Sequence, residues 1–244
     1  MRIFILTAAI LSAAFLFSCN SGSGSKESLS EKKPEISEEQ KIFDRIDTLK
    51  TLAEDGDLIV RFNDNLISYQ IKNLNDSDRT FSHGGIVMTI NGRKMVCNID
   101  ADEEGVDTVR YDPIDSFLNP KKNTICGLYR YNLSADEKTA FIKELNHYHE
   151  IKAHFDRVFD LQTDNAIYCS EMIYKSLKRA THGRLVIKTS LAPPKMQPLL
   201  HKYFEKKLSL RAIAKRKFIT IDNLYLIPDC KQIMRFPLKY FPGQ

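Results

Sequence analysis

The pattern of apolar and polar residues predicts a chain of mixed helices and strands from residue 37 onward. Ser37 is typical of a helix N-cap, and the Asp55-Gly56 pair predicts the end of that first helix. Asn91-Gly92 lies between two apolar runs, which is typical of a β-hairpin. The predicted helices cover 37–54, 112–118, 134–153 and 169–180, and the predicted strands cover 57–62, 82–90, 94–100, 106–111, 124–131, 218–221 and 232–236.

The region from residue 37 to the end is predicted to be one domain. It holds no internal repeat and no inner linker rich in Gly or Ser, and it is long enough to bury a sizeable core. Pro193, Pro194 and Pro198 predict irregular structure between the last helix and the last two strands. We therefore expect a single α+β domain over 37–244.

The N-terminal residues are typical of an export signal. Arg2 precedes an apolar run over 3–17 that is shorter than the roughly 20 residues of a membrane span. The run ends in Leu16-Phe17-Ser18-Cys19, which resembles the bacterial lipobox, in which the cysteine is lipidated. We expect a lipoprotein signal peptide over 1–18, a flexible Ser/Gly-rich tether over 19–36 and a lipid-anchored, periplasm-facing location at the cell envelope. A secretory peptide without lipidation is the alternative.

Composition and charge exclude some classes of protein. The 244 residues are 43% hydrophobic and 27% charged, which excludes a disordered or fibrous chain. From Lys175 to the end, 16 Lys and Arg residues face only three acidic residues. Runs such as Lys206-Lys207 and Lys215-Arg216-Lys217 suit anionic lipid headgroups or an anionic cell-wall polymer, although a solvated basic face is the simpler interpretation. No nucleic-acid-binding motif accompanies these runs, so we expect no nucleic-acid partner.

The histidine and cysteine spacing does not predict a metal site or a cofactor. His147, His149 and His154 do not share one face of a helix, and the sequence has no phosphate-binding glycine loop and no Gly-x-Ser-x-Gly motif. The cysteines after Cys19 form no CxxC pair and have no metal-like spacing. They are Cys97, Cys126, Cys169 and Cys230.

Two residues are candidates for nucleophilic chemistry. Cys169 lies at a predicted helix N-terminus, where the helix dipole stabilises a thiolate. His83 begins a predicted strand beside Gly84 and Gly85, which permit a close backbone approach. A histidine is the usual base for a cysteine nucleophile. Taken singly, a buried small cysteine and a structural histidine are the simpler interpretations.

Taken together, three segments resemble a known family. Gly56-Asp57-Leu58-Ile59, then Ser82-His83-Gly84-Gly85-Ile86, then Tyr168-Cys169-Ser170-Glu171 resemble the permuted papain-like cysteine hydrolases, the YiiX-like branch of the NlpC-type peptidase superfamily. A further likeness lies at residues 154–161, which contain Phe155-Asp156 and resemble a strand of that family, and the resemblance covers about 55–180. It implies a circularly permuted papain-like (NlpC-type) α+β fold, with an antiparallel sheet packed against helices that include the cysteine-bearing helix.

The resemblance also implies roles for individual residues. Cys169 would be the nucleophile and His83 the general base, with a third polar residue on the strand after the histidine. Relatives commonly have Glu or His there, whereas this chain offers Asn98, with Asp100 as the alternative on the same strand face. The backbone N–H of Cys169 is the expected oxyanion donor. Ser82 and Tyr168 are expected to bind substrate.

We therefore expect an exported, lipid-anchored cysteine hydrolase that cleaves an amide bond, in cell-wall peptides, through an acyl-enzyme. One alternative keeps the Cys169–His83 pair but acts on a lipid acyl group, as a hydrolase or acyltransferase. The other is a catalytically inactive envelope binding module with the same fold. The expected partners are the cell-wall peptide or lipid acyl substrate and the membrane reached through lipidated Cys19, with no metal and no other cofactor.

Overall fold

The computed structural model describes residues 37–101 and 107–239. The predicted signal peptide, the Cys19 lipidation site and the predicted tether lie outside the described residues. The described residues belong to one compact unit. Within the described ranges, none of the helices combines the length and the apolar character that a membrane crossing needs.

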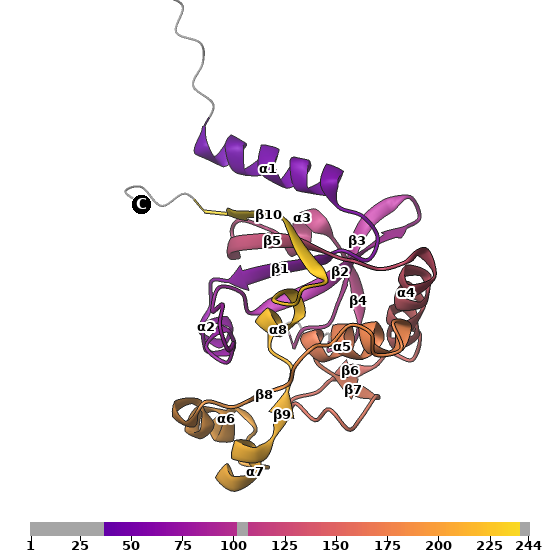
Figure 1. The fold of residues 1–244 in the computed structure, drawn as a ribbon. Coiled ribbons are helices and arrows are strands. Elements are labelled where there is room, and N and C mark those ends of the chain that lie inside the picture. The colour runs from indigo at the N-terminus through magenta and orange to yellow at the C-terminus, as the bar shows by residue number, and fades with distance from the viewer. Residues whose placement is uncertain (1–36, 102–106, 240–244) are drawn as a thin grey trace, which may run out of the picture. The chain divides into compact units, whose positions relative to one another are not determined.

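A six-stranded sheet in which every neighbouring pair is antiparallel forms the centre of the fold (Figure 1). Its strand order is β10-β5-β1-β2-β3-β4. The strands are β1 (Leu58–Asn63), β2 (His83–Ile90), β3 (Arg93–Asn98), β4 (Arg110–Pro113), β5 (Asn123–Tyr131) and β10 (Cys230–Pro237). Two small sheets accompany it: β6 (His154–Phe155) pairs in parallel with β7 (Ala166–Ile167), and β8 (Ser190–Leu191) pairs with antiparallel β9 (Lys217–Phe218).

The helices lie between and beside these strands. They are α1 (Glu38–Leu52), α2 (Leu66–Lys72), α3 (Ile114–Phe117), α4 (Ala135–Glu150), α5 (Cys169–Ala180), the 3-10 helix η1 (Pro194–Met196), α6 (Gln197–Tyr203), α7 (Leu210–Lys215) and α8 (Ile221–Tyr225). Local capping fixes several helix starts. The Ser37 hydroxyl accepts a hydrogen bond from the Gln40 N–H at the start of α1, and Ser134 forms a capping box with Glu137 at the start of α4.

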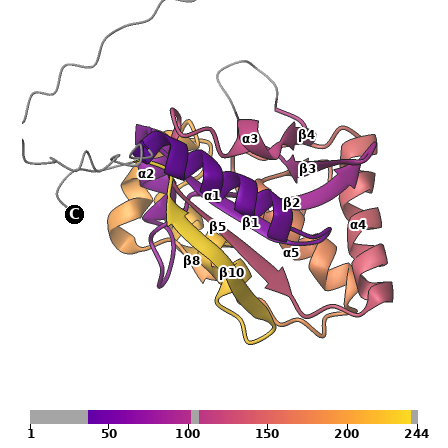
Figure 2. The same cartoon turned by 90° about the horizontal axis from the view of Figure 1, so that it is seen from above.

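Both faces of the sheet are covered by apolar side chains, because successive residues of a strand point to opposite faces. Leu58 and Val60 of β1 pack in one core cluster with buried residues of α4 and α5. Ile59, between them, belongs to the other cluster, which includes Ile46 and Leu49 of α1. Figure 2 shows α1 lying across the sheet, on the face away from α5. Helix α5 and its cysteine are therefore positioned by the first cluster.

Most of the predicted regular elements are confirmed, including α5 with the same bounds and the hairpin at Asn91-Gly92. Some bounds differ. Strand β3 ends at Asn98 rather than residue 100, helix α4 ends at Glu150 rather than residue 153, and the strand predicted over 106–111 is β4 over 110–113. The expectation of an α+β fold with an antiparallel sheet packed against the cysteine-bearing helix is confirmed.

The predicted irregular structure around the prolines is wrong in part. Pro194 begins η1 and Pro198 lies in the first turn of α6, where the missing N–H would have no helical partner in any case. Helix α2 was not predicted, because its residues form no buried stripe. The strand predicted over 218–221 ends at Phe218, and α8 then begins at Ile221. Asp222 of α8 accepts backbone hydrogen bonds from residues 77 and 78, a tertiary contact that periodicity does not reveal.

Candidate active site

Cys169 and His83 both line one cavity of about 140 Å³. Segments far apart in sequence supply its wall: α2, the start of β2, the loop after β3, the start of α5, α6 and the connection from β9 to α8. Most of the wall is apolar or aromatic, with Phe159 and Tyr203 among the aromatic residues. Such a concave, mainly apolar pocket with a few convergent polar groups is typical of a binding site.

Cys169 is the first residue of α5, and its side chain is buried. The backbone N–H groups of Gly84 and Ser170 lie near the sulfur and lower the pKa of the thiol, while the Ser170 hydroxyl donates to the Ile219 carbonyl at 2.8 Å. Burial and the nearby Asp100 carboxylate outweigh these donors and raise the pKa of Cys169 to about 12. The sulfur therefore lies beside β2, near Gly84, the residue that follows His83. Cys169 is therefore a protonated thiol at neutral pH, although the sequence favours a thiolate.

His83 is the first residue of β2, and its side chain is buried. Its Nε2 lies 3.3 Å from Asn98 Oδ1 and 3.9 Å from Asp100 Oδ2. Burial lowers the pKa of His83 to about 4; Asp100 acts in the opposite direction, and the neighbouring Arg61 guanidinium lowers the pKa further. The imidazole is therefore neutral near pH 7.

Asn98, the last residue of β3, is held with its carbonyl oxygen toward His83. Its Nδ2 donates to Asp112 Oδ2 at 2.9 Å and to the Val96 carbonyl at 3.1 Å. Because a carboxylate only accepts, these bonds identify the amide nitrogen and leave Oδ1 to accept from Nε2–H of His83. The arrangement fixes the histidine tautomer, so that Nδ1 is the unprotonated, basic nitrogen.

The sequence did not single out Asp112. Asp112 lies on β4, where it pairs with Val96 of β3. Val96 is two residues before Asn98 on the same strand. The predicted strand over 106–111 ended just before it, and Asp112-Pro113 was interpreted as the start of a short helix. Only the observed register of β4 brings this carboxylate to the amide.

Asp100 also lies beside His83, on the wall of the cavity. Its Oδ2 is 3.4 Å from a terminal nitrogen of Arg61, a residue that faces His83 in the pairing of β1 with β2. Arg61 is buried, donates to the Phe117 carbonyl at 2.8 Å and stacks over the Phe117 ring at 4.3 Å. Both orienting candidates therefore reach His83, and Asn98 is the nearer; their catalytic roles stay predictions.

The two predicted substrate-binding residues, Ser82 and Tyr168, also line the cavity. Ser82 is buried, and within the described part of the chain its hydroxyl has no hydrogen-bond partner. Tyr168 uses its hydroxyl to accept a hydrogen bond from the Ile219 N–H at 2.8 Å, and its ring centroid lies 4.8 Å from that of Phe159. Ser82 thus has a buried hydroxyl without a protein partner beside the cavity, whereas the Tyr168 hydroxyl stabilises the wall.

Glu171 anchors the turn that presents Cys169. Its carboxylate forms an ion pair with Lys175 at 2.8 Å and accepts a hydrogen bond from the Tyr168 N–H at 3.4 Å. Its side chain is fully buried, and burial raises the pKa of Glu171 to about 8 despite the lysine. These contacts position the residue before the cysteine and explain an acidic residue in the first turn of α5.

The other histidines and cysteines do not join this site. Across residues 37–101 and 107–239, no group of three or more His, Cys, Asp or Glu side chains could hold a metal ion. His147 and His149 lie on α4, and His154 begins β6. The four described cysteines are free thiols: Cys97, Cys126, Cys169 and Cys230.

Comparison with known proteins identifies the family of this chain. The sequence model of the permuted papain-like amidases, the YaeF/YiiX enzymes of the C92 family, matches residues 53–222. The chain belongs to this family. It is therefore a cysteine amidase or peptidase of permuted papain-like fold, as the sequence resemblance implied. A comparison with curated proteins found no match.

A solved structure supports the fold. The crystal structure described as metalloprotein YiiX from Escherichia coli O157:H7 is similar, with a TM-score of 0.60 and 18% sequence identity. The match covers 75% of this chain and 98% of that chain. At this identity the likeness shows the fold alone. The word metalloprotein describes that protein.

Proposed function

We propose that the chain hydrolyses an amide bond through a Cys169 nucleophile, with His83 as general base. One observation carries this proposal: Cys169 and His83 line the same buried cavity, and Asn98 contacts the nitrogen of His83 that does not act as base. A cysteine, a histidine and an orienting amide are the three groups that this chemistry requires. Ordinary core residues need not meet at a cavity.

Catalysis starts from the neutral thiol and neutral imidazole. Nδ1 of His83 takes the thiol proton as the Cys169 sulfur attacks the carbonyl carbon of the substrate, and the oxygen becomes an oxyanion. The N–H of Cys169, at the start of α5, would donate to that oxyanion. The imidazolium then protonates the leaving amine, which departs and leaves a thioester. Water attacks this thioester with His83 again as base, which releases the carboxylic acid and restores the thiol.

The cavity wall supports an apolar acyl group in the substrate. Ile67 and Ile71 of α2 line one part of the wall, and Phe155, Phe159 and Phe218 line others. An acyl chain buried among these side chains would gain the favourable free energy of leaving water. The unpartnered Ser82 hydroxyl would hydrogen-bond a polar atom of the substrate. We therefore propose an amide with an apolar acyl side as the preferred substrate.

A cell-wall peptide is the second candidate substrate. Asp100 and Arg157, of opposite charge, both line the cavity, and they suit the charged ends or side chains of a peptide. The leader sequence supports the same setting, because Arg2, the apolar run and Cys19 are typical of a lipoprotein exported to the envelope. We propose that the mature chain is anchored there, facing the periplasm.

Hydrolysis of two substrate panels tests the proposal. One panel contains N-acyl amino-acid amides of increasing acyl length, and the other contains soluble muropeptides. We expect amide cleavage by the wild-type chain, a rise in kcat/KM with acyl length, and loss of activity in Cys169→Ala and His83→Ala. Ser82→Ala should raise KM more than it lowers kcat.

Cys97→Ala is the matched control. Cys97 is also a buried cysteine, on β3 beside β2, but it does not line the cavity. It should retain activity. Cleavage of muropeptides alone would favour the second substrate. Cleavage that survives Cys169→Ala would contradict the mechanism, and a folded chain inactive on both panels would support the binding-module alternative.

A further inference from the structure

The segment from β8 to β9, residues 190–218, is strongly basic; we call it the basic lobe. It contains eight Lys and Arg residues and a single acidic residue, Glu205, so its net charge is +7. Figure 1 shows α6, α7 and β9 grouped together, apart from the six-stranded sheet. Seven of the eight cations are exposed: Lys195, Lys202, Lys206, Lys207, Arg211, Lys215 and Lys217.

Few anionic groups of the described chain neutralise this charge. Arg216 is half-buried and faces Asp160 at 3.4 Å, and Lys207 pairs with Glu205 at 2.8 Å. Among the described residues, no other carboxylate forms an ion pair with a cation of the lobe. A solvated ion pair between exposed residues contributes little to stability, so folding alone does not explain a concentration of cations here.

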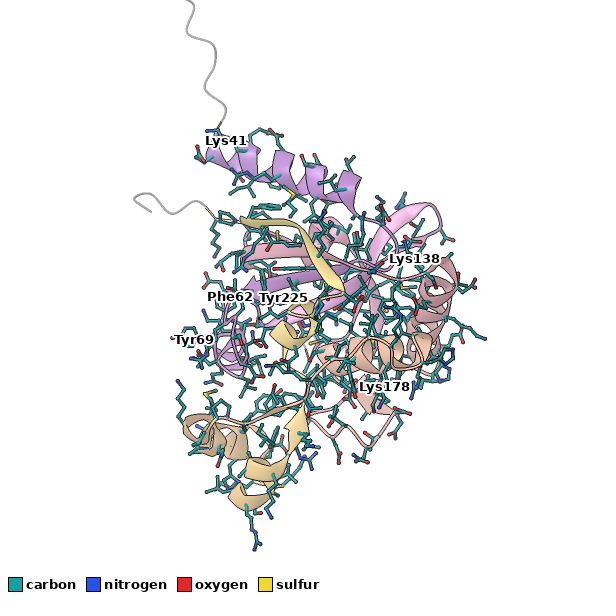
Figure 3. The ribbon with its side chains drawn as sticks, viewed as in Figure 1. Lys41, Phe62, Tyr69, Lys138, Lys178 and Tyr225 are labelled. Atoms are coloured by element: carbon teal, nitrogen blue, oxygen red, sulfur yellow. The ribbon has the colours of Figure 1, made fainter. Side chains whose placement is uncertain are left out.

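The same lobe exposes large apolar side chains. Leu191 is 53% exposed and pairs with exposed Lys217 between β8 and β9, and Leu210 is 48% exposed and precedes exposed Arg211. Across the cavity, α2 exposes Leu66 and Ile67, and Tyr69 projects from the same helix (Figure 3). Single exposed leucines are ordinary, but leucines set among lysines are typical of surfaces that lie on a lipid bilayer.

The lobe also forms part of the cavity wall. Tyr203 of α6 and Phe218 of β9 line the cavity that holds Cys169, together with Ile67 and Ser68 of α2. A partner surface that binds the lobe would therefore lie beside the cavity. A polyanion would be attracted by the cations alone, whereas a bilayer also accommodates the exposed leucines.

We propose that the basic lobe is a docking surface for a bilayer that contains anionic phospholipid. The cations bind the headgroups, and Leu191 and Leu210 enter the boundary between headgroups and acyl chains. This contact is additional to the expected lipid anchor at Cys19, and it would orient the cavity toward the membrane. It does not depend on the catalytic proposal, because docking needs neither Cys169 nor His83.

Vesicle co-sedimentation of residues 20–244 tests the surface. This chain lacks the leader and the acylated cysteine but retains every described buried residue of both core clusters. The lobe variant carries Lys206→Glu, Arg211→Glu and Lys215→Glu. We expect wild-type protein to bind vesicles of mixed phosphatidylcholine and phosphatidylglycerol, and the lobe variant to bind at least about tenfold more weakly.

A charge-matched control carries Arg93→Glu, Lys121→Glu and Lys143→Glu, three exposed cations outside the lobe. It should bind as tightly as the wild type. Wild-type binding should fall when salt is raised from about 0.1 M to about 0.5 M, because salt screens exposed charges. Circular dichroism and thermal unfolding show that each variant is folded.

The leucines distinguish a bilayer from a soluble polyanion. Leu191→Ser with Leu210→Ser should weaken binding to the mixed vesicles and leave binding to polyglutamate unchanged. Equal binding by the lobe variant and the control would overturn the proposal, as would wild-type binding to polyglutamate without binding to vesicles. Full-strength vesicle binding by the leucine variant would overturn the bilayer assignment.

Discussion

The amide of Asn98 is held on one side by Asp112 and on the other faces His83, so three residues from β2, β3 and β4 act in series. Arg110 contributes to the same group, since its Nε donates to Asp112 Oδ2 at 3.1 Å. An amide free to rotate could present either oxygen or nitrogen to the imidazole. Asp112 removes that freedom and thereby selects one tautomer of His83.

Removal of this support should reduce turnover. Asp112→Ala is expected to lower kcat by about 10- to 100-fold with little change in KM, because the base is misoriented while the cavity is intact. Asp112→Asn should recover most of the activity, since its side-chain oxygen still accepts from Asn98. Steady-state kinetics on the best amide substrate provide the measurement. An unchanged kcat in Asp112→Ala would show that Asn98 does not need this partner.

The fall of kcat/KM at low pH should reflect the pKa of His83. Burial lowers the pKa of His83 to about 4, so the imidazole stays a competent base down to that pH. We expect kcat/KM of the free enzyme to fall with a midpoint near pH 4 rather than near the usual histidine value of about 6.5.

Asp100→Asn removes the carboxylate that raises the pKa of His83, so the midpoint should move to still lower pH. Ser82→Ala, which changes no charge, is the control and should leave the midpoint unchanged. A wild-type midpoint near 6.5, or an upward shift in Asp100→Asn, would contradict the burial argument.

At the scale of elements, β2 and β3 must approach closely for His83 to contact Asn98. A Cβ on Gly85 would lie 2.4 Å from Val96 Cγ1 and 2.8 Å from the Cys97 carbonyl, distances that no relaxed structure contains. The sequence correctly indicated that glycines beside the histidine allow a close backbone approach. The neighbouring Gly84 is less constrained, because its nearest contact would be 3.3 Å from Val60 Cγ1.

Gly85→Ala should therefore separate the strands and disturb the site. We expect a loss of stability of about 1 to 3 kcal/mol from overpacking, together with at least a tenfold loss of kcat, since Asn98 lies on the displaced strand. Urea unfolding and steady-state kinetics measure the two effects. Gly84→Ala is the comparison, with a smaller loss of stability. Wild-type stability in Gly85→Ala would refute the close approach.

The loop after β6 shapes the cavity through backbone strain. Phe159 has a φ of +53°, a conformation that bulky residues rarely adopt. The Asp156 carboxylate accepts hydrogen bonds from the N–H groups of Val158 and Asp160, and these hold the turn. The strain places the Phe159 ring against Tyr168, beside Phe204 and Phe218. The family likeness over 154–161, expected as a strand, is therefore mostly a capped turn, and only His154 and Phe155 form a strand.

At the scale of the whole molecule, the sheet separates two cores. The cavity and α5 lie on the side of the first cluster, and α1 packs on the other side through Ile42, Ile46 and Leu49. The second cluster also reaches the site through Phe117 of α3, whose ring centroid lies 5.6 Å from that of His83, whereas Ile42, Ile46 and Leu49 lie on α1. Stability and catalysis are then separable by substitution in α1.

Leu49→Ala tests this separation. Leu49 is fully buried, so we expect the free energy of unfolding to fall by about 2 to 5 kcal/mol, while kcat/KM per folded molecule stays unchanged. Leu52→Ala, at a side chain 44% exposed on the same helix, should change stability by no more than about 0.5 kcal/mol. Urea unfolding gives the first quantity and active-site-normalised kinetics the second. A catalytic defect in Leu49→Ala would show that the two faces are coupled.

The sequence by itself determined the local structure and the family. Helical and alternating periodicity predicted α1, α4, α5 and the sheet strands, because each element buries one face and its pattern is local. The three family segments placed Cys169 and His83 as candidates before any contact was known. The resemblance of these segments to the family also implied the permuted fold.

Tertiary structure alone decided the environment of the site. The register of β4 brings Asp112 to Asn98, and segments distant in sequence close the cavity around Cys169. Burial then raises the pKa of the thiol and lowers that of the imidazole, in the direction opposite to the helix-dipole argument made from sequence. Desolvation depends on every neighbour in space, whereas periodicity reports only neighbours along the chain.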